Sequence, residues 1–134
     1  SPDGKGLLCK CVKCNFENDI IYKTDDLKTY DLGMKEIGIY FQNKGAQVIT
    51  FKRHNDEIVK GGLVLTEYHT NDNEIKWLWF TLNRETLILK SIYPNSNVRQ
   101  CVLYSNKDKL DNAMYDLFIK YQNKLNLKLK KNKL

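Results

Sequence analysis

The spacing of the apolar residues changes near residue 105, and this change constrains the fold more than any other feature of the chain. Between residues 20 and 104, apolar side chains occur in short runs that alternate with polar ones, which is the period of a β-strand. From residue 107 to residue 125 they recur every three or four positions, which is the period of one face of a helix. The sequence therefore predicts a mainly β fold with one C-terminal α-helix.

Turn-forming residues divide the β region into seven predicted strands. Asn43, Lys44 and Gly45 separate two alternating runs, as in a β-hairpin. The predicted strands are residues 20–22, 37–42, 48–53, 62–68, 77–82, 87–92 and 98–104. A run at residues 7–10 competes with 20–22 for the place of the first strand. The chain is thus predicted to contain an N-terminal leader over 1–18, one domain over 19–125 and a basic C-terminal tail over 126–134.

The charge of the chain favours an anionic partner. Its 134 residues, enough for one domain, include 22 basic and 16 acidic side chains, and 19 of the basic ones are Lys. Lys ammonium groups act as point charges, which suit a diffuse anionic surface better than the bidentate reading of base edges. No apolar run approaches the roughly 20 residues that span a bilayer. We therefore expect a diffuse anionic partner and no membrane-spanning segment.

The cysteines form a cluster with one distant member. Cys9, Cys11 and Cys14 follow a C-x-C-x2-C pattern, and Cys101 lies far downstream. A structural zinc site requires four ligands, and a second cysteine pair is missing. We interpret the four side chains as reduced thiols of a cytosolic protein, with zinc, disulfides or acylation as the alternatives. No metal is predicted.

The sequence offers little support for catalysis. It contains neither a Gly-rich phosphate loop nor a nucleophile motif such as G-x-S-x-G. We therefore predict a non-enzymatic protein without a cofactor.

Seven strands followed by one helix, together with three local segments, resemble the pleckstrin homology domain family. The segments are the hairpin over residues 36–53, the Gly-containing strand that begins at Lys60, and the passage from strand to helix over 99–117. The resemblance covers residues 19–125 and implies a seven-stranded antiparallel β-barrel or sandwich capped by the helix. The chain departs from the family in lacking the helix Trp, and Ile37 replaces the Arg of the phosphoinositide-binding pattern.

The resemblance implies an anionic phospholipid as the partner, bound at the open end of the first sheet. It also implies a cytoplasmic protein that associates peripherally with membranes, such as the cytosolic face of secretory organelles. Because Ile37 replaces that Arg, we expect phosphatidic acid to be favoured over polyphosphoinositides. The Lys- and Asn-rich composition is typical of an AT-rich genome, and with the leader it is similar to the acylated branch of the family in apicomplexan parasites. That similarity implies lipid sensing that regulates microneme secretion. The candidate headgroup-binding residues are Lys23, Lys28, Lys35, Lys52, Arg53, His54 and Lys60.

Two other functions are compatible with the sequence. If residues 77–82 form one strand, Leu78, Phe80 and Leu82 line the core. Trp77 and Trp79 are then covered by the leader, bind a protein partner or reach a membrane interface. A protein-interaction module with the same fold is therefore the main alternative. Binding of single-stranded nucleic acid comes third and is unlikely, because acidic residues flank the aromatic segment.

Overall fold

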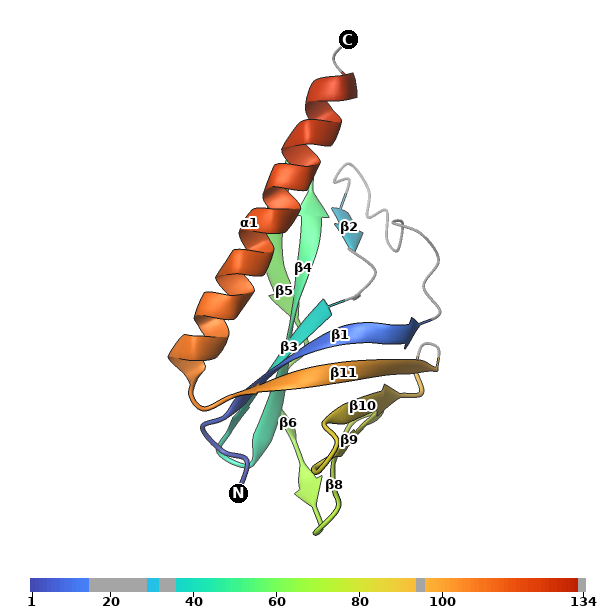
Figure 1. Cartoon of the computed structure of the whole chain (residues 1–134), viewed down its shortest axis with the longest axis vertical. Helices are drawn as coiled ribbons and strands as arrows, with labels where there is room; N and C mark the ends of the chain where they lie inside the picture. Colours follow the sequence, from blue (N-terminus) through green and yellow to red (C-terminus); the bar gives the residue numbers. More distant parts are fainter. Residues whose placement is uncertain (15–28, 32–35, 94–95, 133–134) are drawn as a thin grey trace.

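A computed structural model describes residues 1–14, 29–31, 36–93 and 96–132. It consists of a curled antiparallel β-sheet and one long C-terminal helix, so the predicted mainly β class is confirmed (Figure 1). The described residues form eleven strands rather than the predicted seven, because several strands lie wholly or mostly outside the predicted runs and two predicted runs are interrupted.

The first half of the sheet contains β1 to β6. Their bounds are β1 Gly6–Cys14, β2 Thr29–Asp31, β3 Glu36–Gln42, β4 Gly45–His54, β5 Glu57–Gly62 and β6 Thr66–Glu67. The second half contains β7 His69–Thr70, β8 Glu74–Trp77, β9 Phe80–Asn83, β10 Ile88–Ser91 and β11 Asn97–Tyr104. The helix α1 spans Lys107–Asn132.

The first and last strands lie side by side in the middle of the sheet. The strand order is β2-β4-β3-β1-β11-β10-β9-β8-β7, and β5 and β6 pair with β4. Strand β1 is therefore a central strand, held by β3 on one edge and β11 on the other. Residues 6–14, expected to belong to the leader, instead form a strand of the sheet, and residues 6–9 are buried between its two neighbours. The competing first strand at residues 20–22 lies outside the described residues.

The predicted hairpin at Asn43 and Lys44 is confirmed. Gln42 pairs with Gly45, and the two residues between them have φ angles of 50° and 58°. Positive φ at both central residues matches the right-handed twist of the flanking strands. The Asp3 carboxylate accepts the Lys44 backbone N–H at 3.1 Å, which fixes the N-terminus to this turn.

Two predicted strands are wrong because the chain turns inside or before them. The strand expected over 62–68 instead begins at Glu57, after a two-residue turn. The strand expected over 77–82 contains a hairpin, in which Trp77 pairs with Phe80 around Leu78 and Trp79. Leu78 has φ 47°, a left-handed conformation uncommon for a leucine. The turn could not be predicted from local pattern, because it contains no Gly, Asn or Pro.

One apolar cluster, which we call the inner core, lies inside the curl of the sheet. Its members come from strands at both ends of the sheet, including Phe41 from β3 and Trp77 from β8. The rings of these two residues meet edge to face, with centroids 5.7 Å apart. Trp77 also stacks on Phe80 at 5.2 Å. Residues so distant along the sheet meet because the sheet curls.

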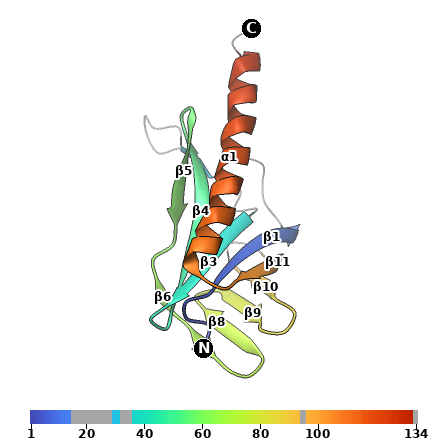
Figure 2. The ribbon, with the colours of Figure 1, turned by 60° about the vertical axis from the view of Figure 1, so that its left-hand side comes forward.

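A second cluster, the outer core, lies between the opposite face of the sheet and α1 (Figure 2). Along β1, Leu7 belongs to the inner core and Leu8 to the outer core, as expected for alternating side chains. The helix approaches β1 closely at Gly6, where a Cβ atom would lie 2.7 Å from Leu110. The apolar stripe predicted on the helix is therefore buried, against a face of the sheet rather than at an open end.

The helix begins at Lys107, as predicted, but ends later than predicted. Asn106 is the N-cap, since its side-chain oxygen accepts the Lys109 backbone N–H at 2.9 Å. The helix continues to Asn132, so most of the predicted basic tail is helical. Further along, Gln122 accepts the Ile58 backbone N–H at 2.8 Å and donates to the Asp56 carbonyl. These bonds join the helix to the β4–β5 hairpin and satisfy backbone groups at the edge of the sheet.

Candidate anion-binding site

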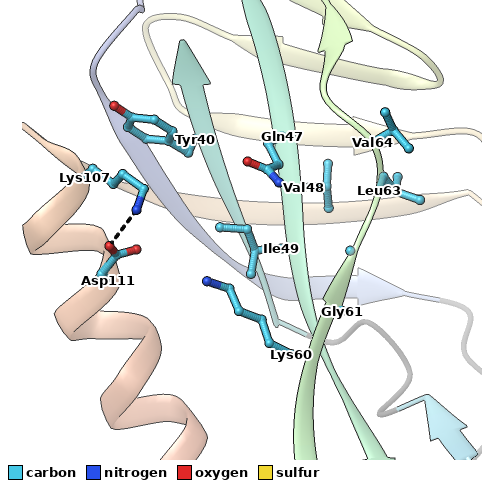
Figure 3. Close-up of a pocket in the computed structure, with 11 residues that line it drawn as sticks. Tyr40, Gln47, Val48, Ile49, Lys60, Gly61, Leu63, Val64, Lys107 and Asp111 are labelled. Atoms are coloured by element: carbon cyan, nitrogen blue, oxygen red, sulfur yellow. Dashed lines mark hydrogen bonds and ion pairs between the residues drawn. The ribbon is translucent and has the colours of Figure 1, made fainter.

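A pocket of about 460 Å³ lies where the first turn of α1 faces strands β3, β4 and β5 (Figure 3). It forms where β5 ends at Gly62, which has φ 154° and lies so close to the Val48 backbone that no side chain fits there. Beyond Gly62 the chain leaves the sheet through Leu63 and Val64, and a space stays open beneath the helix. The lining residues are Tyr40, Gln47, Val48, Ile49, Lys60, Gly61, Gly62, Leu63, Val64, Lys107 and Asp111.

Two lysines from different elements supply the positive charge of this pocket. Figure 3 shows Lys60 reaching into it from β5 and Lys107 from the start of α1. The Lys107 ammonium donates to the Asp111 carboxylate at 3.1 Å, and this hydrogen bond raises the pKa of Lys107. With two cations and one anion, the lining carries a net charge of +1, which matches one small anionic group.

The pocket also has an apolar rim. Val64 is 84% exposed and the neighbouring Leu65 is 40% exposed. Single exposed apolar residues are common on protein surfaces, but here they adjoin a cationic pocket. The combination of ammonium groups and an apolar rim is amphipathic, as is a phospholipid.

The predicted site residues are not brought together. Lys23, Lys28 and Lys35 lie outside the described residues. Lys52, Arg53 and His54 lie at the end of β4, next to the hairpin turn, and Arg53 donates to the Asn55 carbonyl at 2.8 Å. Of the four predicted residues that the structure describes, Lys60 is the one that lines the pocket.

Strand register explains this separation. Lys60 is opposite Phe51, whose ring packs against Phe118 of the helix, so Lys60 lies on the helix side of the sheet. Lys52 is opposite Val59 and lies on the other side, where its side chain crosses Gly61. Lysines on opposite faces of one hairpin cannot bind the same phosphate, so Lys52 and Lys60 do not share a site.

A second group of cations lies along α1. Lys120, Lys124, Lys128 and Lys131 are all exposed, and their spacing puts them on one side of the helix. No acidic residue follows Asp116 in the chain. This group, the helix lysine stripe, is a positive surface outside the pocket.

The predicted single strand over 77–82, with Trp77 and Trp79 on one face and Leu78 in the core, is wrong, whereas binding of a protein partner there stays a prediction. Trp77 is 2% exposed and belongs to the inner core, whereas Leu78, expected in the core, is 52% exposed. Trp79 is partly buried and packs against Tyr93 at a centroid distance of 5.0 Å. The turn at Leu78 and Trp79 reverses the chain, so the expected alternation of faces does not continue through it.

The cysteines are paired, and the prediction of reduced thiols is wrong. Cys9 and Cys101 are directly opposed on β1 and β11 and form a disulfide, and Cys11 and Cys14 form a second one. Pairing follows from the central position of β1, which puts Cys9 beside the last strand.

Sequence reasoning missed Lys107, Tyr40 and Gln47 as lining residues of the pocket. The sequence identified Lys107 as the first residue of the predicted helix. The residues that it contacts in the pocket depend on where the helix packs on the sheet, which the sequence pattern does not show. Tyr40 and Gln47 are cross-strand partners in the predicted hairpin, so their common face could have been inferred.

No protein-family model, curated protein or solved structure matches the chain. Within the part of the chain that the structure describes, no helix combines the length and apolar character needed to cross a membrane. The pleckstrin homology resemblance therefore stays a prediction.

Proposed function

We propose that this protein is a binding module for anionic phospholipids, which it contacts through the pocket between α1 and β5. The observation that carries this proposal is the convergence of Lys60 and Lys107 on one pocket beside the exposed Val64. In this arrangement the ammonium groups hold the phosphate, and the apolar rim faces the acyl region. The curled sheet with a C-terminal helix is compatible with a pleckstrin homology-like architecture.

The charge of the pocket favours a small headgroup. One of its two ammonium groups is already paired with Asp111, so a single phosphate balances the remaining charge. A polyphosphorylated inositol would bring several negative charges to a lining with a net charge of +1. We therefore propose phosphatidic acid as the preferred lipid, with a membrane surface as the site of action.

The helix lysine stripe contributes in a different way. Lysines near an anionic bilayer each add about 1 kcal/mol of attraction, without distinguishing one headgroup from another. The stripe therefore increases binding to any anionic membrane, while the pocket supplies the preference.

Vesicle co-sedimentation with phosphatidylcholine containing phosphatidic acid, phosphatidylserine or a polyphosphoinositide tests this division. Replacing both Lys60 and Lys107 with Ala removes two cations, and we expect phosphatidic acid binding to weaken roughly 30-fold. The matched control, Lys5→Ala with Lys90→Ala, has the same charge change outside the pocket, and we expect a much smaller effect. Equal weakening in both variants would show that only net charge matters.

Asp111→Asn changes binding in the opposite direction. Without the carboxylate, Lys107 loses its competing partner and both ammonium groups face the phosphate. We expect tighter binding to phosphatidic acid vesicles, by several-fold. Unchanged or weaker binding in this variant would contradict the pocket as the headgroup site.

A further inference from the structure

The two disulfides lie next to each other on β1 but in different surroundings. Cys9 is fully buried and Cys101 is 4% exposed, so their bridge is part of the inner core. Cys11 and Cys14 are only partly buried, at the end of the strand. An attacking thiol therefore has access to the second bridge and is excluded from the first.

The backbone at the second bridge is irregular. Cys11 is opposite Arg99 and Lys13 is opposite Val98, so two residues of β1 occupy the place of one at this point. This is a β-bulge, a feature that often occurs beside functional sites. The Cys11–Cys14 bridge spans the bulge and closes a loop of four residues, a sequence separation of 3.

Several basic residues adjoin the second bridge along the chain or across the ladder. Lys10 and Lys13 are exposed on either side of Cys11, and residues 4–14 contain no acidic side chain. Burial lowers the pKa of Arg99, across the ladder from Cys11, to about 10, so this guanidinium remains a cation at neutral pH. Nearby cations lower the pKa of a cysteine thiol and stabilise it as a leaving group.

Loop length separates the roles of the two bridges. The entropy that a disulfide removes from the unfolded chain increases with the length of the loop that it closes. Cys9–Cys101 joins residues 92 positions apart, whereas Cys11–Cys14 joins near neighbours. Opening the shorter bridge is therefore expected to reduce the stability of the fold less than opening the longer one.

We propose that Cys11–Cys14 is a thiol–disulfide exchange site, and that Cys9–Cys101 is a structural bridge. A dithiol reductant supplies the electrons. Its thiolate attacks one of the two sulfur atoms, the Cys11–Cys14 bond breaks, and a mixed disulfide forms while the other cysteine leaves as a thiolate. The second thiol of the reductant then displaces the attached cysteine. The reductant ends as its own disulfide, and its two protons end on Cys11 and Cys14.

The test is reduction of the folded full-length protein with dithiothreitol, followed by alkylation and peptide mapping. We expect alkylation of Cys11 and Cys14 at least tenfold faster than that of Cys9 and Cys101, with two thiols per folded chain and four after denaturation. Simultaneous reduction of both bridges, reduction of Cys9–Cys101 first, or no reduction before unfolding would each overturn the proposal.

Two variants test the origin of the reactivity. Lys10→Gln with Lys13→Gln removes the flanking cations, and we expect reduction of Cys11–Cys14 to slow several-fold. Lys5→Gln with Lys90→Gln is the matched control with the same charge change, and its rate should equal that of the wild type. Equal rates in all three proteins would contradict activation by the flanking lysines. Cys11→Ser with Cys14→Ser should remove the rapidly reacting pair while the protein stays folded.

Discussion

The inner and outer cores use the two faces of one sheet, but they hold the molecule together in different ways. The inner core collects side chains from Leu7 to Cys101 and includes an aromatic cluster and a disulfide. The outer core joins one helix to a few strands and is supplemented by hydrogen bonds at its edge. The comparison indicates that the inner core maintains the curl of the sheet, whereas the outer core determines where the helix lies and hence the shape of the pocket.

The largest expected effect comes from opening the inner core. Trp77→Ala removes a ring that contacts Phe41 and Phe80, and we expect a loss of about 3–5 kcal/mol in the free energy of unfolding. Trp79→Ala is the control, because that ring is only partly buried, and about half the loss or less is expected. Urea denaturation measures both variants. Similar losses of stability in the two variants would mean that these residues stabilise the turn, and would contradict the larger role of Trp77 in the inner core.

The next effect tests the approach of the helix to the sheet. In Gly6→Ala the new methyl group would lie 2.9 Å from Leu110 Cβ, an atom that moves only with the helix, so we expect a loss of about 1–3 kcal/mol. In Gly38→Ala the neighbour at 2.8 Å is the sulfur of Met114, a flexible side chain, and we expect a smaller loss. Thermal or urea unfolding that ranks Gly38→Ala as the worse variant would contradict this view of the outer core.

The smallest effect concerns a polar contact at the edge of the outer core. The Tyr121 hydroxyl donates to the Glu36 carboxylate at 3.2 Å, and Tyr121→Phe should reduce stability by about 0.5–1.5 kcal/mol at neutral pH. Burial, and then the Glu36 carboxylate, raise the pKa of Tyr121 above its ordinary value of 10.0. Its contribution is therefore complete below about pH 10 and is lost as the pH rises further.

Unfolding measured from pH 8 to pH 11 checks this linkage. We expect the stability of the wild type to fall more steeply above pH 10 than that of Tyr121→Phe, because the variant has no proton to lose at this position. Parallel curves for the two proteins would show that the hydroxyl is not buried against Glu36. Lysine titration affects both proteins alike and cancels in the comparison.

The sequence predicted local structure correctly where the relevant residues are close neighbours in the chain. The hairpin at Asn43 and Lys44 and the start of the helix at Lys107 were predicted correctly, since turn chemistry and apolar period are properties of short segments. The turn at Leu78 was missed because its residues are not typical of turns. The strand at 6–14 was undervalued because its central position depends on pairing with a strand some 90 residues away.

Local sequence pattern predicted only some of the residues of the candidate pocket. Lys60 was among the residues predicted to bind an anion, but its intended neighbours Lys52 and His54 lie on the opposite face of the hairpin. Their separation depends on the pairing of His54 with Glu57, because a shift of one residue would exchange the two faces. Lys107 joined the site through the docking of the helix, which no local pattern encodes.

The spacing of apolar residues in the sequence is sufficient to predict which segments form strands and which one forms a helix. Backbone geometry fixes the side-chain period at two residues in a strand and 3.6 residues in a helix. The sequence by itself also determined the excess of lysine that makes an anionic partner plausible. The tertiary structure alone decided that Cys9 meets Cys101, that Lys60 meets Lys107, and that Trp77 is buried. Each of these contacts joins residues that are brought together by the curl of the sheet, by strand register or by helix docking, and these depend on the packing of the whole chain.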